Sequence, residues 1–263
     1  MKCLQYAGHK IMPSTAMRFV TCLIVILALL PCSQARSASQ ADGADDLSAS
    51  PTIVFGFVGG FVRHDDMVHS VVQLAALLRK QSPSGAIVKT FQNHDGANAY
   101  RDILTLLDTN HDGTLSVAEK HAARIIFYGH SWGASESIFL AGQLGKENIP
   151  VLLTVQVDSV AKPGQNDVVI PENVAEAINF YQTDGLLHGA PKIRAADAAR
   201  TRILGNFRIS YAAVPYNCID YPWYARIFMR AHTQIECDPK VWRQVGSLIR
   251  SILDSSAKAR PGH

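Results

Sequence analysis

The chain has 263 residues, of which 48% are hydrophobic, so it can bury one sizeable core, and a single α/β domain is expected. The formal net charge of +3 belongs to the N-terminus, because residues 1–35 hold Lys2, Lys10 and Arg18 and no acidic residue. The rest of the chain is therefore neutral, which gives no reason to expect nucleic acid as a partner.

The N-terminus has the pattern of a secretory signal peptide. Phe19–Leu30 is a largely apolar run of 12 residues preceded only by basic charges, and Ser33–Ala35 offers small residues for cleavage after Ala35. The run is short for a bilayer span, so we expect a secreted or periplasmic protein with no stable membrane span after cleavage; an uncleaved anchor is the alternative. Residues 36–50 are rich in Ala, Ser and Asp and are predicted to form a disordered leader.

From residue 51 the sequence predicts alternating strands and helices in one domain that ends at residue 256, followed by a flexible tail at 257–263. The predicted strands are 52–58, 87–91, 125–128 and 151–157, and the predicted helices are 68–80, 97–107, 132–145 and 239–253. Uninterrupted apolar runs such as Ile125–Tyr128 are typical of strands that are buried on both faces. The alternation indicates a mostly parallel sheet with helices on both faces.

The stretch after residue 163 gives weaker signals. Pro171–Tyr181 is predicted to be a helix, because Pro171 suits the first helical position and Glu172 and Glu176 share a wet face. Phe207–Val214 is a predicted strand. Leu186–Gly205 mixes Gly, Pro and charges and receives no assignment, and Gln182–Gly205 is a candidate cap over a site.

Gly129–Gly133 reads Gly-His-Ser-Trp-Gly and fits Gly-x-Ser-x-Gly, the pattern of a nucleophile on a sharp strand-to-helix turn. A serine hydroxyl needs a base to take its proton, so it must stand clear of its own backbone and face a histidine. The glycines on either side make room for that turn. A chance match is the alternative, but the apolar strand before the motif and the helix after it favour Ser131 as a nucleophile.

With this motif, residues 51–254 resemble an α/β-hydrolase of the lipase and esterase type. The resemblance implies the chain order serine, acid, histidine. It favours His232, on a predicted loop ahead of the last helix, over His188 as the base. It favours Asp158, directly after the strand 151–157, as the acid. The other candidate acids are Asp184, which is the reserve, and Asp167, Asp197 and Asp220.

The resemblance also implies an oxyanion hole, in which backbone N–H groups stabilise the negative oxygen of the reaction intermediate. One donor is the residue after the nucleophile, Trp132. The other lies in the loop after the first strand, where either Gly60 or Phe61 would donate. A plain turn at Gly59–Gly60 is the alternative.

Residues 108–119 match the pattern D-x-[DN]-x-[DN]-G-x₅-E of a calcium-binding loop at every specified position. The loop resembles an EF-hand, and the predicted oxygen ligands are Asp108, Asn110, Asp112, Thr114, Ser116 and Glu119. It stands without a second loop in this chain, so an acidic surface turn is the alternative. We expect a structural Ca²⁺, since the loop leads into the strand that carries Ser131.

Only Cys218 and Cys237 of the five cysteines remain after removal of residues 1–35. In an oxidising compartment two cysteines favour one disulfide, with two buried thiols as the alternative.

Together these features predict an exported serine hydrolase that cleaves carboxylic esters of small molecules or lipids through an acyl-enzyme on Ser131. A thioesterase or an amidase would use the same triad. The alternative from another class is a non-catalytic, calcium-stabilised binding protein with a hydrolase-like fold.

Overall fold

The structure is a computed structural model that describes residues 51–81 and 86–258. The predicted signal peptide, the leader and the end of the tail lie outside the described residues. So do the three cysteines that precede Cys218.

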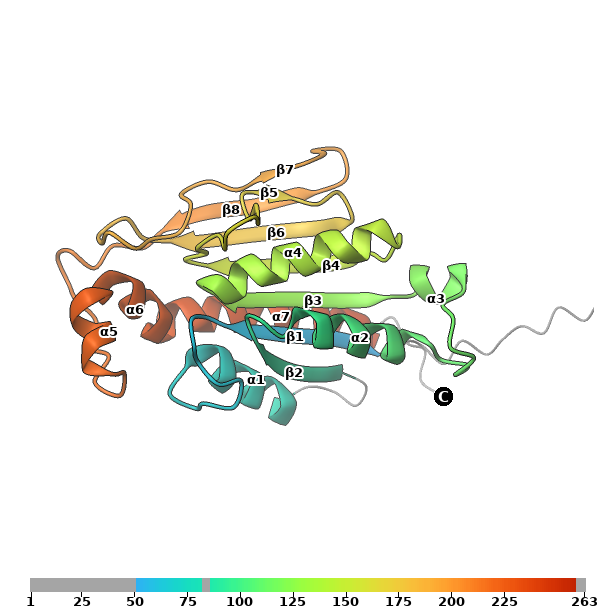
Figure 1. Cartoon of the computed structure of the whole chain (residues 1–263), viewed down its shortest axis with the longest axis horizontal. Coiled ribbons are helices and arrows are strands. Elements are labelled where there is room, and N and C mark those ends of the chain that lie inside the picture. The colour runs from blue at the N-terminus through green and yellow to red at the C-terminus, as the bar shows by residue number, and fades with distance from the viewer. Residues whose placement is uncertain (1–50, 82–85, 259–263) are drawn as a thin grey trace, which may run out of the picture. The chain divides into compact units, whose positions relative to one another are not determined.

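A six-stranded sheet forms the centre of the domain (Figure 1). Its strands run in the order β2-β1-β3-β4-β6-β8, and every neighbouring pair is parallel. The bounds are β1 (Thr52–Val58), β2 (Ala86–Gln92), β3 (Arg124–His130), β4 (Val151–Val157), β6 (Val174–Tyr181) and β8 (Arg202–Arg208). The prediction of a mostly parallel α/β sheet is confirmed.

Helices cover both faces of this sheet. Helices α1 (Ser70–Gln81) and α7 (Pro239–Lys258) pack on one face, and α2 (Gly96–Leu107) and α4 (Trp132–Lys146) pack on the other. Strand β3 shows how one apolar run serves both layers, since Ile126 and Tyr128 join the first core and Ile125 and Phe127 join the second. A strand buried on both faces needs such a run.

The predicted helix at Pro171–Tyr181 is wrong, because this segment contains β6. Val174 N–H donates to the carbonyl of Pro171 and forms a turn instead of a first helical turn. The strand then lies between β4 and β8 and is buried from Ala177 to Phe180. Glu176 pairs with Arg202 on the neighbouring strand β8, so the polar residue that suggested a wet helix face belongs to a cross-strand pair.

The predicted strand at 207–214 is wrong in its bounds, since β8 ends at Arg208. The unassigned stretch contains β7 (Arg194–Ala195), which pairs with β5 (Val169–Ile170) in a small second sheet. Ile170 and Ile193 pack in the same core as α4, so this small sheet takes the place of a covering helix beside α4. The candidate cap at 182–205 is therefore partly a layer of the domain.

Three short helices complete the described structure: α3 (Val117–His121), α5 (Trp223–Phe228) and α6 (Arg230–Cys237). Helices α5 and α6 were not predicted from the sequence, and they lie together at one end of the sheet (Figure 1). Among the described helices, none is both long enough and apolar enough to cross a membrane.

Candidate active site

Ser131 lies on a tight turn between β3 and α4. It is the N-cap residue of α4, with φ 56° and ψ −129°. A non-glycine residue in this region is strained, so neighbouring contacts must hold it there. Its N–H donates to Val157 O over 3.1 Å, and its carbonyl accepts from Ala134 N over 3.0 Å. The end of β4 and the first turn of α4 thus fix the serine backbone.

Glycines surround this turn because the backbone segments approach too closely for side chains. A Cβ on Gly129 would lie 2.7 Å from Ala134 N, and a Cβ on Gly133 would collide with the carbonyl oxygen of Phe57. A Cβ on Gly59, in the loop after β1, would lie 2.8 Å from Ser131 Cβ. The two glycines of the motif and the loop glycine therefore all make room for the serine.

Asp158 follows β4 directly and is hydrogen-bonded to His232, with Asp158 Oδ2 2.7 Å from His232 Nδ1. A carboxylate only accepts, so Nδ1 carries the proton and Nε2 is free to act as a base. Burial raises the pKa of Asp158, but its hydrogen bonds and the charge of His232 outweigh burial, so the pKa is lowered. Two of those bonds come from Gly189 N and Gln182 Nε2, each over 2.7 Å. Asp158 is therefore held as an anion.

His232 lies in helix α6 and not on a loop, which corrects the sequence prediction. Its ring lies over that of His130, with the centroids 4.4 Å apart. Cys237 ends α6 and is joined by a disulfide to Cys218, with the two Cα atoms 5.9 Å apart. No hydrogen bond joins Ser131 Oγ to His232 within the described residues. Such bonds are often loose in ligand-free proteins and tighten when substrate binds.

The other candidate acids and the other candidate base have different partners. Asp184 accepts from Ser210 Oγ over 2.8 Å and from the backbone N–H of Tyr211. Asp167 is hydrogen-bonded to Ser159. The ring of His188 contacts the carbonyl of Gly189 over 3.0 Å. Of the carboxylates in the described part of the chain, Asp158 is the one that is hydrogen-bonded to His232.

The loop after β1 contacts the start of α4. Gly60 adopts φ 54° and its carbonyl accepts from Asn93 Nδ2, so the backbone here is fixed in a turn. The Phe61 ring packs edge-on against the Trp132 ring, with the centroids 5.9 Å apart. Trp132 is the first residue of α4, where backbone N–H groups have no acceptor within the helix. The segments that hold the predicted oxyanion donors Gly60, Phe61 and Trp132 thus lie together.

Sequence reasoning missed a buried cluster next to this site. His69 Nδ1 is 2.6 Å from Glu236 Oε1, and His130 Nδ1 is 3.4 Å from Glu236 Oε2. Burial lowers the pKa of His130 to about 4, so the ring is neutral at pH 7. The available signal was the spacing of His232 and Glu236, which share a helix face, but it needed the helix α6 to be recognised.

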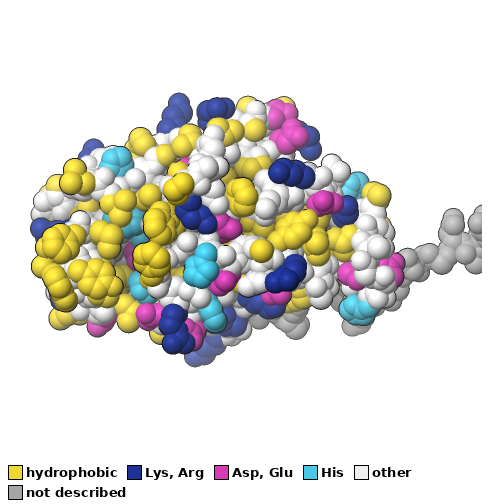
Figure 2. All heavy atoms as spheres, viewed as in Figure 1, with side chains coloured by type: hydrophobic (Ala, Val, Ile, Leu, Met, Phe, Trp, Pro, Cys, Tyr) yellow, Lys and Arg dark blue, Asp and Glu magenta, His cyan; other side chains and the backbone are white. Residues whose placement is uncertain are grey.

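A cavity of about 270 Å³ opens beside His232. Its apolar lining comes from Leu186, Leu187, Ile227, Phe228, Met229 and Ala231, and Asp184, Arg230 and Gln234 add polar groups to the wall. Hydrophobic side chains also gather on the surface over α5 (Figure 2), where Trp223, Ile227 and Phe228 are exposed. An apolar group is therefore the ligand chemistry that this end of the molecule fits.

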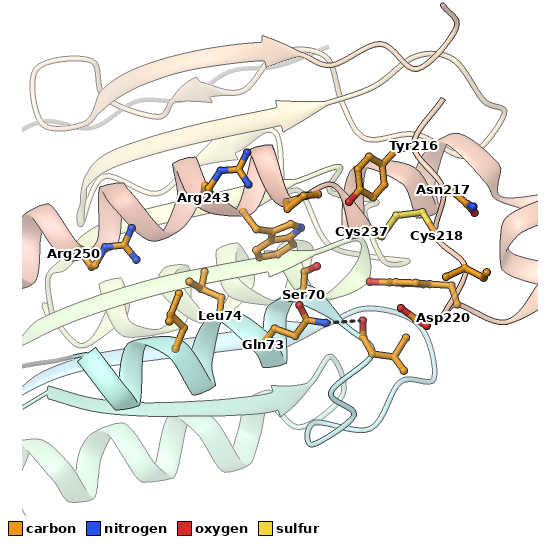
Figure 3. A pocket seen from close by; sticks show the side chains of 16 residues that line it. Ser70, Gln73, Leu74, Tyr216, Asn217, Cys218, Asp220, Cys237, Arg243 and Arg250 are labelled. Atoms are coloured by element: carbon orange, nitrogen blue, oxygen red, sulfur yellow. Dashed lines mark hydrogen bonds between the residues drawn. A yellow bond between two sulfur atoms is a disulfide. The ribbon is translucent and has the colours of Figure 1, made fainter. Parts of the chain in front are cut away.

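A larger cavity of about 380 Å³ lies between α1, α7 and the segment that carries Cys218 (Figure 3). The disulfide forms part of its wall, and Ser70, Gln73 and Arg243 contribute polar groups. Neither Ser131 nor His232 lines it. Of these two cavities, only the one of about 270 Å³ is lined by the candidate base His232, so it is the candidate functional cavity.

The predicted calcium loop is stabilised by its own backbone. Asp108 accepts from the N–H of Asp112 over 3.2 Å and of Gly113 over 3.0 Å, and Gly113 makes the bend with φ 83°. Glu119 accepts from Ser116 N over 2.9 Å and Thr109 N over 2.8 Å, and these bonds lower the pKa of Glu119 to about 2. Within the described residues, no group of three or more His, Cys, Asp or Glu is arranged to hold a metal ion. Calcium binding stays a prediction.

No protein-family model matches this sequence, and no curated protein matches it. The fold is shown at the level of a parallel α/β sheet flanked by helices, which is compatible with an α/β-hydrolase.

Proposed function

We propose that this chain is an exported serine hydrolase with the α/β-hydrolase fold, which cleaves carboxylic esters through an acyl-enzyme on Ser131. The observation that carries the proposal is the buried Asp158–His232 pair at the same sheet edge as a strained serine. Val157 and His130 are paired in neighbouring strands, so Asp158 and Ser131, the next residues along β4 and β3, lie at adjacent strand ends. A turn with φ 56° has no evident use in a purely structural loop, but it presents a hydroxyl.

The α/β-hydrolase assignment is supported by the chain order of the three residues and by their elements. The serine follows a central strand and begins a helix, the acid follows the next strand of the sheet, and the histidine comes last. The loop after β1 packs against the serine, as the second oxyanion donor requires. The position of the base within α6 departs from the loop that the resemblance implies.

The reaction follows from these positions. Ser131 Oγ attacks the ester carbonyl carbon while His232 Nε2 takes the hydroxyl proton, and Asp158 stabilises the resulting imidazolium. The carbonyl oxygen becomes negative and accepts from the N–H of Trp132 and of Gly60 or Phe61. The C–O bond to the alcohol then breaks, and His232 returns its proton to the alcohol oxygen. Water repeats the sequence on the acyl-enzyme and releases the carboxylic acid.

The substrate class is an ester with an apolar acyl or alcohol group, from a small molecule or a lipid. This follows from the apolar lining of the cavity beside His232. Thioesters and amides would pass through the same steps, so the choice among them rests on the leaving group and not on the triad.

Export and a structural Ca²⁺ belong to the same proposal. The disulfide between Cys218 and Cys237 is compatible with an oxidising compartment. Asp108, Asn110 and Asp112 would bind the ion with Thr114, Ser116 and Glu119, and the ion would add rigidity to the segment ahead of β3.

Hydrolysis of a series of nitrophenyl esters of increasing acyl length tests the proposal. Wild type is expected to cleave them, and Ser131→Ala is expected to lose at least about 10³-fold in kcat. Ser251→Ala, on the exposed face of α7, is the matched control and should equal wild type. A folded wild type without any hydrolysis would favour the non-catalytic binding protein.

A further inference from the structure

A second buried carboxylate, Glu236, lies one helical turn after His232 on α6. Residues with this spacing share a helix face, so both side chains project toward the same side. Glu236 Oε1 is 2.6 Å from His69 Nδ1, and Oε2 is 3.4 Å from His130 Nδ1. The His130 ring in turn lies against the His232 ring at 4.4 Å. Glu236 therefore contacts His69, just before α1, and His130, just before Ser131. Through the His130 ring it is linked to the candidate base His232.

The charges of this cluster are unequal. Burial raises the pKa of Glu236, but His130, His69 and His232 outweigh burial and lower it. Burial also lowers the pKa of His69, but the hydrogen bond and charge of Glu236 raise it overall, with a smaller contribution from Asp66. The groups facing Glu236 are thus His69, whose pKa is raised, and His130, whose pKa is lowered, with His232 behind His130 and the Tyr221 ring packed on His69 at 5.0 Å.

Stability alone is a poor reason for such a cluster. A buried carboxylate loses its hydration, and a buried ion pair often contributes no more than apolar side chains of the same volume. The two oxygens of Glu236 instead face different rings, since one contacts His69 and the other faces His130 and, behind it, His232. The negative end of the pair is therefore nearer to the ring that becomes positive in the proposed reaction.

We propose that Glu236, held by His69, is a positioning residue for His232. Its pairing with His69 fixes α6 so that His232 Nδ1 faces Asp158. Its negative charge, acting across the neutral His130 ring, favours the positive form of His232 when the serine proton arrives. This inference rests on the proposed function, since it assigns a second carboxylate to the same base.

The test compares Glu236→Gln and His69→Gln with the matched control Glu172→Gln, whose carboxylate is exposed and pairs with Arg200 on the surface. Titration with a fluorophosphonate counts the active sites, and nitrophenyl ester hydrolysis gives kcat, KM and the pH profile per active site. Glu236→Gln is expected to lower kcat about tenfold with KM unchanged. The acid limb of kcat/KM should move to lower pH, because a base facing less negative charge is protonated less readily.

His69→Gln keeps a hydrogen-bond donor but removes the counter-charge, so it should also lower kcat without changing KM. The double variant should be no slower than the slower single variant, since the two residues act as one pair. If Glu236→Gln does not fold, the same loss of kcat in His69→Gln supports the inference, and an unchanged kcat there overturns it. If both variants fold and match Glu172→Gln in kcat and acid limb, Glu236 has a structural role only and the inference is overturned. A wild type that the fluorophosphonate does not label would overturn the proposed function as well.

Discussion

Asp158 orients the candidate base, and three donors in addition to His232 hold it as an anion. Replacing Asp158 by Asn keeps its shape but lets the ring of His232 adopt the wrong tautomer. We therefore expect Asp158→Asn to lower kcat by about 10³–10⁴-fold with KM little changed. Asp184→Asn is the matched control, because Asp184 contacts Arg208, Ser210 and Tyr211 instead. An activity loss in Asp184→Asn but not in Asp158→Asn would reverse the assignment of the acid.

At the level of single residues, the sequence predicted the site residues that directly follow a strand. Ser131 and Asp158 each follow an apolar run, and parallel strands bring such positions to one edge of the sheet. Glu236 and His69 escaped prediction because their contact joins segments far apart in the chain. No local pattern marks a glutamate as buried, since glutamate is usually exposed.

Two glycines of α4, Gly133 next to Ser131 and Gly142 farther along the helix, differ in the space around them. Gly133→Ala is expected to lower the free energy of unfolding by about 1–3 kcal/mol, because its Cβ collides with the carbonyl of Phe57. Gly142→Ala in the same helix meets only Pro171 Cγ at 3.6 Å and should raise it by about 0.5–1 kcal/mol. Urea denaturation of both variants measures the difference. Equal stabilities would mean that the turn is looser than the structure shows.

The loop from Asp108 to Glu119 makes a prediction of its own. Ca²⁺ should raise the melting temperature relative to EGTA, because an ion that binds only the folded state stabilises it. Asp108→Asn keeps one of the two oxygens that accept from the N–H groups of Asp112 and Gly113, and it loses the charge. It should lower the melting temperature in EGTA only slightly and lose most of the response to Ca²⁺. Identical wild-type melting temperatures in Ca²⁺ and EGTA would mean that the loop is an acidic surface turn that binds no Ca²⁺.

The elements that the sequence predicted correctly are those whose pattern has one interpretation. Val151–Val157 is rich in β-branched and other apolar residues, with only Thr154 and Gln156 polar, and its predicted bounds match β4. Pro171–Tyr181 is predicted as a helix from Pro171 and from the shared face of Glu172 and Glu176, whereas Glu176 pairs with Arg202 on β8, a contact that local sequence does not reveal. Tertiary pairing overrides local preference in such a strand. Helices α5 and α6 are short, so their periodicity was too brief to recognise.

The stability of the whole molecule should depend on pH through His130. Its pKa is lowered to about 4 in the folded state by burial, against a usual value of 6.5. The unfolded chain therefore binds a proton that the folded chain does not, and stability falls as pH drops below 6.5. His69 has a raised pKa, so its stabilisation is fully present below pH 6.5 and does not change in this window.

We expect a loss of about 1 kcal/mol in the free energy of unfolding between pH 6 and pH 5. Urea denaturation at the two values measures it, and His130→Asn should remove most of the difference. A pH-independent wild type in this window would show that His130 takes up its proton in the folded state as readily as in the unfolded state.

For the molecule as a whole, the sequence predicted a mostly parallel sheet with helices on both faces but not the position of helix α6. This helix lies at the end of the sheet, where the disulfide joins Cys237 to Cys218. That position brings His232 to Asp158, and it depends on the packing of α6 against distant segments. The fold class was therefore predictable, and the helix that presents the base was not.

The proposed reaction requires Ser131 to be a nucleophile that His232 and Asp158 activate. Incubation with a fluorophosphonate, followed by peptide mass spectrometry, tests it most directly. We expect one covalent adduct, on Ser131, which forms in wild type and is lost in Ser131→Ala and in His232→Ala. No adduct on the folded wild type, or an adduct on another residue, would contradict it.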